Sequence, residues 1–417
     1  MDKILIIGID GVPYGLLDEF SRTGIMPSIA RIRGRGIFKK TKAPIPAVSS
    51  VSWTSFMTAA NPGEHGIFGF EEIDPETYEY RFHSFSEVKL KTFWERKNRR
   101  AIVINLPQTY PAVPINGILI SGFVAPDIKK AVYPPSLLPV LIKMGYKVDV
   151  DFSLARDKKR DFIKELRRAL SIRMKLAENL WKEEWNIFFF VITGTDRLHH
   201  FLFDAYEHPE HEFRRDFEEY YRLVDKVVGK LFKKAREENV PAVVLSDHGF
   251  CGVRKEVYIN SYLQEWGYLH IGDVSQGLKS LEPSTTAFAL NPARIYIHLK
   301  GKYSRGKVEK KDYEKLVEEL KRRFLSIEIE GDSPISKVFH KEEIYSGSYL
   351  DRAPDLLLLS KRGYDLKAGF REGKLFGTSH FKGMHTQDDA FVLSSIHLDF
   401  AEQPFIYEVS QKIEQLI

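Results

Sequence analysis

The sequence predicts an α/β fold in which a mostly parallel central sheet carries helices on both faces and an α+β cap is inserted. Three observations lead to this prediction. Short apolar runs alternate with long segments of helical periodicity, acidic side chains follow the apolar runs, and residues 258–350 change to shorter mixed segments. The 417 residues, of which 43% are hydrophobic, suffice for one large domain with an insertion.

The apolar runs indicate buried parallel strands, because a strand covered on both faces is apolar along its whole length. The predicted core strands are residues 3–9, 101–106, 186–193 and 241–245. The predicted helices are residues 14–33, with an interruption at Pro27, and residues 92–99, 155–184 and 211–239. Strands that alternate with helices in this way form a parallel sheet with helices on both of its faces.

Residues 258–350 break this alternation and are predicted to form the inserted cap. Within them, residues 287–299 predict a pair of strands and residues 310–325 an amphipathic helix. Two later apolar runs, residues 355–360 and 390–395, are expected to return to the core sheet. The predicted domain boundaries are therefore 1–257 and 351–417 for the catalytic core and 258–350 for the cap.

Charge and composition exclude several classes of protein. Lys and Arg number 62 against 57 Asp and Glu, and this mild net charge of +5 does not indicate a nucleic-acid-binding protein, which normally has a clustered basic stripe. The basic residues 158–175 are mixed with acidic ones, which indicates a solvated helix face. The single cysteine, Cys251, rules out an intrachain disulfide. Without a targeting segment or an apolar run of membrane-spanning length, we expect a cytoplasmic protein with no membrane association.

Three aspartates stand where predicted core strands end. Asp10, Asp196 and Asp247 each come within three residues after an apolar run. In open α/β sheets, ligands bind at the edge where the strands have their carboxyl ends. Taken singly, Asp10 and Asp247 could be turn residues and Asp196 could cap a helix. Their shared position favours a common site at this edge.

Histidines accompany two of these aspartates at short spacing. Asp196 and His200 are four residues apart, so one turn of helix places both side chains on the same face, and His199 should point elsewhere. Asp247 and His248 are adjacent, and both can reach one metal ion only from an irregular turn. The glycine that follows them supplies this conformational freedom. The spacing therefore predicts metal ligands.

Two further segments complete the candidate set. His385 lies in a Gly-Met-His-Thr segment close to His380, and either could be an ordinary surface histidine. Residues 46–55 hold several hydroxyls, of which Ser49 is the candidate nucleophile. A serine hydroxyl is a poor nucleophile at its free pKa, but a bound metal ion can activate it. The alternative is a hydroxyl-rich loop that caps a helix beginning near Trp53.

Together these motifs resemble the alkaline phosphatase superfamily, and within it the type I phosphodiesterase/nucleotide pyrophosphatase branch. The segment Pro62-Gly-Glu-His65-Gly-Ile is similar to the signature that ends the nucleophile loop of that branch, and counting back along the loop gives Ser49 as the nucleophile. The resemblance implies an alkaline-phosphatase-like fold with two divalent metal ions. It implies that one ion is held by Asp196, His200 and His385, and the other by Asp10, Asp247, His248 and the Ser49 oxygen. Zinc is the usual occupant in the family, and carboxylate and imidazole ligands suit zinc or manganese.

The resemblance implies a metal-dependent phosphodiesterase or nucleotide pyrophosphatase that forms a phosphoseryl intermediate on a small phosphate-ester or nucleotide substrate. Two departures leave the substrate class open. The branch commonly has Thr where this chain has Ser49, and Asn three residues later where this chain has Ser52. The alternative is therefore a phosphomonoesterase or phosphomutase with the same site. Ser50 and Ser52 are the expected substrate contacts, and Ser50 is also the rival nucleophile.

Several other side chains are candidates for substrate contact. Those for a phosphate are Arg197, Lys382 and Arg352, and those for stacking on a base are Trp53, Phe68 and Phe70. The alternatives for these two sets are surface charges and core packing. The segment that begins at Ser49 argues against a sulfatase, because it lacks the Pro and Arg which that branch requires. A non-catalytic protein that binds only a nucleotide or a metal ion is the remaining alternative.

Overall fold

The computed structural model describes residues 1–369 and 373–417. Within it the chain divides into two compact units, which are described separately. The core unit comprises Met1–Asn61, Ser84–Gly252 and Phe381–Ile417. The second unit comprises Pro62–His83 and Val253–His380. The second unit thus includes residues on either side of the predicted cap, 258–350, and takes in a separate segment that precedes residue 84.

An eight-stranded sheet forms the centre of the core unit. Its strands, in spatial order, are β2 (Ile37–Thr41), β19 (Ala390–Ser394), β9 (Ala242–Leu245), β1 (Ile4–Ile9), β8 (Ile187–Ile192), β5 (Ala101–Leu106), β6 (Gly117–Ser121) and β7 (Val132–Tyr133). The five strands from β9 to β6 run parallel to one another. The pairings of β2, β19 and β7 with their neighbours are antiparallel. The predicted, mostly parallel sheet is therefore confirmed.

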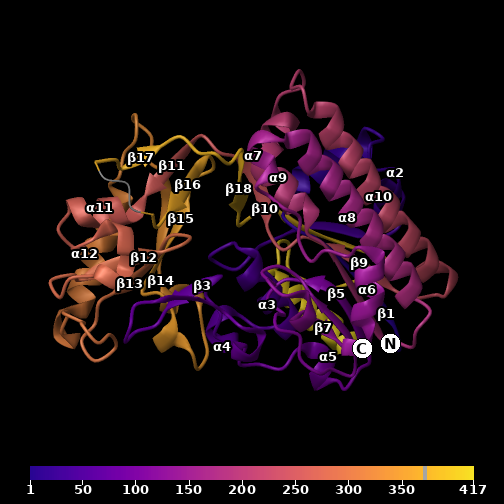
Figure 1. Ribbon diagram of the computed structural model, residues 1–417, viewed down its shortest axis with the longest axis horizontal. Helices are drawn as coiled ribbons and strands as arrows, with labels where there is room; N and C mark the ends of the chain where they lie inside the picture. The colour runs from indigo at the N-terminus through magenta and orange to yellow at the C-terminus, as the bar shows by residue number, and fades with distance from the viewer. Residues whose placement is uncertain (370–372) are drawn as a thin grey trace. The chain divides into compact units, whose positions relative to one another are not determined.

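Helices cover both faces of this sheet. Side chains alternate between the two faces along each strand, so each strand contributes apolar side chains to both layers. One face packs against α1 (Tyr14–Arg22), α2 (Pro27–Arg33), α8 (Lys159–Leu180), α9 (Gly194–Glu207) and α10 (Arg214–Glu237) (Figure 1). The other face packs against α3 (Ser49–Thr58), α5 (Phe93–Arg96) and α14 (Ile406–Leu416). In β1, for example, Leu5 and Ile7 join the first layer, whereas Ile4 and Ile6 join the second.

Two predicted helices are each divided in two. Residues 14–33 form α1 and α2, and Pro27 is the first residue of α2, where its missing N–H costs no hydrogen bond. Residues 155–184 include most of α7 (Leu154–Asp157) and all of α8, and Lys158 lies between the two helices outside the helical region. The short α6 (Leu138–Met144) precedes them.

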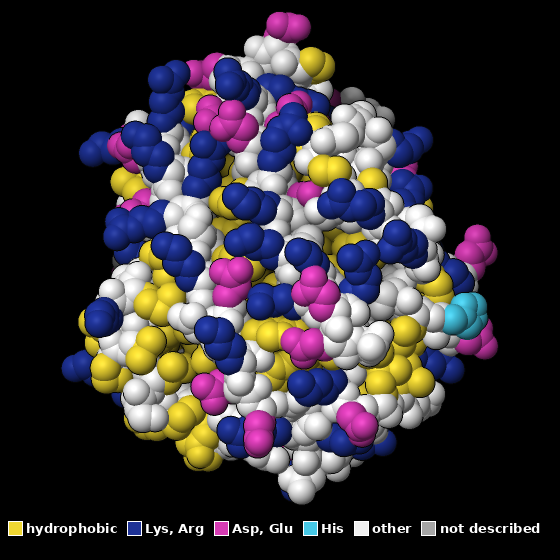
Figure 2. All heavy atoms as spheres, turned by 90° about the vertical axis from the view of Figure 1, so that its right-hand side faces the viewer, with side chains coloured by type: hydrophobic (Ala, Val, Ile, Leu, Met, Phe, Trp, Pro, Cys, Tyr) yellow, Lys and Arg dark blue, Asp and Glu magenta, His cyan; other side chains and the backbone are white. Residues whose placement is uncertain are grey.

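The surface over α8 and α10 is mixed in charge. Figure 2 shows Lys and Arg side chains interspersed with Asp and Glu on the face that carries these helices in Figure 1. Ion pairs such as Arg167 with Glu219 and Lys230 with Glu178 link the two helices. In the described ranges, no helix combines the length and the apolar composition that a bilayer span requires.

The second unit is an α+β structure. Its antiparallel sheet has the order β12 (Ala287–Leu290), β13 (Arg294–Ile297), β15 (Leu356–Ser360) and β14 (Ile335–His340). Its other strands are β16 (Tyr364–Lys367), β11 (Lys255–Tyr258), β17 (Phe376–Gly377), β3 (Glu71–Ile73) and β4 (Tyr80–Phe82). Its helices are α4 (Pro62–His65), α11 (Ile259–Glu265), α12 (Tyr313–Leu325) and α13 (Lys341–Ile344). The prediction that residues 355–360 return to the core sheet was wrong, because β15 pairs with β13 and β14.

Candidate active site

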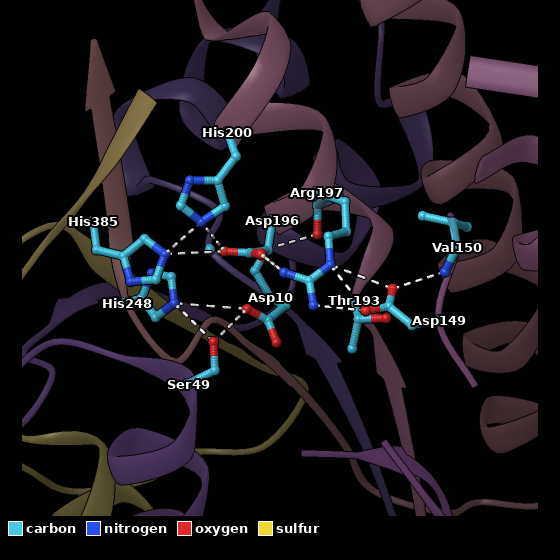
Figure 3. A network of polar contacts seen from close by, with 12 residues as sticks. Asp10, Ser49, Asp149, Val150, Thr193, Asp196, Arg197, His200, His248 and His385 are labelled. Carbon is cyan, nitrogen blue, oxygen red and sulfur yellow. Dashed lines mark hydrogen bonds and ion pairs between the residues drawn. The ribbon is translucent and has the colours of Figure 1, made fainter. Parts of the chain in front are cut away.

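Three buried carboxylates lie at the carboxyl ends of three adjacent strands. Asp10 follows β1, Asp247 follows β9, and Asp196 lies in the first turn of α9 after β8. Their exposed fractions are 0% for Asp10, 0% for Asp247 and 1% for Asp196. Because parallel strands end at the same edge of the sheet, residues far apart in the sequence meet there (Figure 3).

The first group of side chains converges on Asp196. Oδ1 of Asp196 lies 3.4 Å from His200 Nε2, as expected for residues one helical turn apart. His385 comes from β18 (Gly383–Thr386), which pairs with β10 (Gly249–Gly252) in the core unit. Its Nε2 lies 3.1 Å from Asp196 Oδ1 and 3.1 Å from His200 Nε2.

The second group of side chains converges on His248. Its Nε2 lies 3.2 Å from Asp247 Oδ2 and 3.6 Å from Asp10 Oδ1. The other oxygen of Asp247 accepts a hydrogen bond from the backbone N–H of Gly11 at 3.0 Å. Gly11 has a φ of +67°, a left-handed conformation that glycine adopts without strain. The turn after β1 therefore fixes the orientation of the Asp247 carboxylate.

Hydrogen bonds to backbone carbonyls determine the tautomers of two histidines. Nδ1 of His248 lies 3.1 Å from Gly249 O, and Nδ1 of His385 lies 2.9 Å from Ala47 O. A carbonyl oxygen only accepts, so each Nδ1 carries a proton and donates it. In the neutral ring, Nε2 of each histidine then has a free electron pair directed into the site.

Burial and charge shift the pKa values of these groups in opposite directions. Burial, followed by the nearby Asp247 carboxylate, raises the pKa of Asp10 well above its ordinary value. Burial also raises the pKa of Asp247, to about 7. Burial acts to raise the pKa of Asp196 as well, but the neighbouring His200 imidazole, followed by His385, outweighs it and holds that pKa well below the ordinary value. Crowded acidic groups of this kind are typical of a site that binds a cation.

Ser49 is the first residue of α3, and its hydroxyl lies between two of the candidate ligands. Its Oγ is 3.2 Å from Asp10 Oδ1 and 3.2 Å from His248 Nε2. The helix begins four residues earlier than the expected start near Trp53. The first N–H groups of a helix have no partner within it and favour a negative charge nearby. The hydroxyl thus lies where an anionic group would be stabilised.

The structure also places the other expected contacts. Within the described residues, the buried Oγ atoms of Ser50 and Ser52 have no hydrogen-bond partner. Lys382 forms an ion pair with Asp204 at 3.6 Å. In the second unit, Arg352 forms an ion pair with Glu72 at 3.3 Å, and His380 is exposed.

Two aromatic candidates for base stacking are core residues instead. Trp53 is 0% and Phe68 is 2% exposed, so neither has a free ring face, and Phe70 is half-buried. His199 points away from the ligands, as expected. Its Nδ1 lies 2.9 Å from Gly11 O, and the hydroxyl of Tyr221 lies 2.6 Å from its Nε2.

Three contributions of the structure were missed in the sequence. The indole of Trp53 donates a hydrogen bond to Asp10, and the carboxylate of Asp149 binds Arg197. Phe123 lies under the Arg197 guanidinium, with 4.2 Å from the guanidinium carbon to the ring centre. No motif surrounds Asp149 or Phe123 in the sequence, so only the three-dimensional arrangement identifies them.

Fold and site together define a class of enzyme. A mostly parallel α/β core, with a helix-terminal hydroxyl between a carboxylate and an imidazole, is typical of a phosphoric ester hydrolase. Residues 4–388 match the sequence profile of the family described as type I phosphodiesterase / nucleotide pyrophosphatase. The chain belongs to this family, which confirms the family resemblance.

Solved structures with low sequence identity share the fold. Phosphonoacetate hydrolase from Sinorhizobium meliloti 1021, in complex with phosphonoacetate, is 16% identical with a TM-score of 0.69, over 99% of this chain and 95% of that chain. Murine ectonucleotide pyrophosphatase / phosphodiesterase 5, an inactive form in complex with AMP, is 14% identical with a TM-score of 0.57, over 100% of this chain and 95% of that chain. The human form is 12% identical with a TM-score of 0.57, over 99% and 94% of the two chains. Comparison of the sequence with curated proteins gave no match.

Proposed function

We propose that this protein is a two-metal phosphodiesterase or nucleotide pyrophosphatase that acts through a phosphoseryl intermediate on Ser49. One observation carries the proposal. The Ser49 hydroxyl lies 3.2 Å from Asp10 Oδ1 and 3.2 Å from His248 Nε2, at the N-terminus of a buried helix. The roles of Ser50 and Ser52 as substrate contacts belong to the same proposal, because their hydroxyls are buried in the first turn of that helix without a partner among the described residues.

The donor set fits divalent metal ions. Two groups of side chains have ligand atoms that lie within 4.8 Å of one another: Asp196, His248 and His385, and Asp10, Asp247 and His248. His200 completes the first group through its contacts with Asp196 and His385. Electron pairs of imidazoles and carboxylates that face one another repel unless a proton or a cation lies between them. Zinc and manganese accept this mixture of nitrogen and oxygen ligands.

The proposed reaction has two steps, transfer of the phosphoryl group to Ser49 and hydrolysis of the phosphoserine. Divalent ions in such sites polarise a phosphoryl oxygen and make a hydroxyl or water more acidic. Ser49 Oγ forms a bond to phosphorus as the bond to the leaving oxygen breaks, and the leaving group takes up a proton. Water then attacks the phosphoseryl phosphorus, which releases the product and restores the hydroxyl. The first turn of α3 would hold the negative oxygens of the phosphoryl group.

The proposed substrates are small phosphate diesters or nucleotides. The family to which the chain belongs and the AMP complex of a structural neighbour support this class. The phosphonoacetate complex of another neighbour makes a small phosphonate a useful additional substrate to test. The alternative is a phosphomonoesterase or phosphomutase with the same ligands.

The test compares hydrolysis of bis-p-nitrophenyl phosphate with that of p-nitrophenyl phosphate by one zinc- or manganese-loaded preparation. Ser49→Ala is the inactive variant, and Ser50→Ala, its neighbour in α3, is the matched control. We expect a diester preference that is lost on the order of 10³-fold or more in Ser49→Ala. We expect Ser50→Ala to form phosphoenzyme, although more slowly.

Other outcomes would change the proposal in defined ways. A monoester preference that depends on Ser49 would keep the nucleophile and change the function to a phosphatase or mutase. Turnover that survives in Ser49→Ala and is lost in Ser50→Ala would transfer the nucleophile to Ser50. Metal-loaded wild-type protein that hydrolyses neither ester, nor AMP-containing diesters, would refute the proposal.

A further inference from the structure

The two oxygens of the Asp196 carboxylate have different partners. Oδ1 faces His385 Nε2 at 3.1 Å and His200 Nε2 at 3.4 Å. Oδ2 accepts a hydrogen bond from Arg197 Nη1 at 3.1 Å. Figure 3 shows Arg197 on the side of Asp196 opposite to the two histidines. Only one oxygen of Asp196 is therefore directed toward the other candidate ligands.

Arg197 is itself held firmly. Its Nη2 donates to Asp149 Oδ2 at 2.6 Å, and its Nε lies 3.1 Å from Oδ2 and 3.3 Å from Oδ1, so two guanidinium nitrogens bind one carboxylate. Asp149 Oδ1 also accepts the N–H of Val150 at 2.8 Å, so the backbone orients Asp149 in turn. The Phe123 ring lies under the guanidinium. The Arg197 side chain is only 17% exposed.

This arrangement determines how Asp196 can bind an ion. A free carboxylate can bind a metal ion through one oxygen or through both. The hydrogen bond from Arg197 occupies Oδ2 and leaves Oδ1 beside His200 and His385. A lysine could not replace the guanidinium, because a single ammonium nitrogen cannot take the place of the two nitrogens that bind Asp149 while it also donates to Asp196.

We propose that Arg197, held by Asp149, is a positioning residue that makes Asp196 a one-oxygen ligand of the ion shared with His200 and His385. Because that ion belongs to the proposed function, the positioning role rests on that function. Three donor groups of Arg197 are already bound to Asp149 and Asp196, so its role is to orient a ligand. Groups that hydrogen-bond to metal ligands typically change metal affinity by about 10- to 100-fold when they are removed.

The test must separate orientation from charge. Removal of Arg197 alone also removes a positive charge near the ion, which would by itself strengthen cation binding. The double variant Arg197→Met/Asp149→Asn removes the ion pair without changing the net charge. The matched control is Arg167→Met/Glu219→Gln, which removes a 2.8 Å ion pair between α8 and α10 in the same unit. A third variant, Arg197→Lys, keeps the charge and loses the guanidinium.

The measurement is calorimetric titration of chelator-treated protein with Zn²⁺, followed by visible absorption spectra of the Co²⁺-loaded protein. We expect two binding events in the wild type and in the control. In Arg197→Met/Asp149→Asn, one event should weaken by at least about tenfold, and the other should remain unchanged. The Co²⁺ bands should lose intensity, because a second Asp196 oxygen raises the coordination number. Arg197→Lys should show the same changes to a smaller extent.

The possible failures are distinguishable. Wild-type protein that binds no divalent ion would refute the two-metal function, and the positioning role with it. If the wild type binds two ions, and both the double variant and Arg197→Lys bind them with unchanged affinity and unchanged Co²⁺ spectra, the positioning role alone is wrong. Circular dichroism establishes folding first, and Arg197→Lys provides the test if the double variant does not fold.

Discussion

The indole N–H of Trp53 donates a hydrogen bond to Oδ2 of Asp10 at 3.0 Å. The other oxygen of Asp10 lies 3.2 Å from the hydroxyl of Ser49. Ser49 and Trp53 are four residues apart in α3 and therefore lie on the same face of the helix. One helix thus supplies both the candidate nucleophile and the donor that orients a candidate ligand.

Trp53→Phe should weaken metal binding while the core stays packed. The phenyl ring fills much of the same space, but Asp10 loses its donor and is free to rotate. We expect Zn²⁺ affinity to fall about tenfold or more, measured by calorimetric titration, with a parallel loss of diester hydrolysis. Trp94→Phe is the control, because Trp94 is 1% exposed in the same hydrophobic cluster and its Nε1 has no hydrogen-bond partner among the described residues. Equal metal affinity in the two variants would contradict the role of the indole N–H.

Gly8→Ala should displace the ring of the same tryptophan. A Cβ atom at Gly8 would overlap the Trp53 ring, and both residues are enclosed by the core sheet and α3. We expect a loss of about 1–3 kcal/mol in the free energy of unfolding, measured in urea, together with reduced turnover. Gly15→Ala in α1 is the control, because a Cβ there meets nothing within 4 Å and alanine favours a helix. A Gly8→Ala variant as stable as Gly15→Ala would show that the ring adjusts without cost.

His385→Ala should remove one of the two proposed ions. His385 Nε2 lies 3.1 Å from both Asp196 Oδ1 and His200 Nε2, so its loss leaves that group with one ligand fewer. We expect metal analysis after dialysis to give about one ion fewer per chain, and turnover to fall roughly 10²-fold or more. His380→Ala is the control, because His380 is exposed. Two tightly bound ions in His385→Ala would exclude it as a ligand.

His65 should make the second unit sensitive to acid. Burial lowers the pKa of His65 to about 3, from an ordinary value of 6.5, and its Nδ1 accepts the N–H of Ile67 at 3.2 Å. The unfolded chain therefore binds a proton below about pH 6.5 that the folded chain does not bind, so stability is complete above that pH and falls as the pH falls. We expect the titration of this histidine to lower the free energy of unfolding by about 2 kcal/mol at pH 5, relative to its value above about pH 6.5.

The measurement for His65 is urea unfolding of chelator-treated wild type and His65→Gln between pH 8 and pH 5. Glutamine does not titrate, so the stability of the variant should fall less steeply with acid. Parallel pH profiles for the two proteins would mean that His65 does not contribute to the acid sensitivity.

Much of the core and of the candidate site could be predicted because local pattern determines them. Buried parallel strands are apolar throughout, so β1, β8 and β9 were recognisable, and the aspartates that follow them had to meet at one edge of the sheet. The i,i+4 spacing of Asp196 and His200 likewise fixes a shared helix face.

The remaining features depend on tertiary contacts that leave no local signal. Strand β15 is as apolar as a core strand, and nothing in its sequence specifies the sheet in which it pairs. Asp149 is one acidic residue among many, and it gains a role only because Arg197 reaches it from another element. Trp53 was a candidate for base stacking or for core packing, and the direction of its N–H depends on Asp10, which is 43 positions away.

Strand β19 is inserted between β2 and β9, although it comes from residues 390–394, and His385 lies only five residues before it. During synthesis, therefore, β2 and β9 leave the ribosome long before the strand that joins them. The proposed ligand set, which includes His385, is incomplete for the same period. Closure of the core sheet and completion of the proposed Asp196, His200 and His385 site must both wait for the same late stretch of chain. A protein interrupted before it would lack a finished core together with one of its two proposed ion sites.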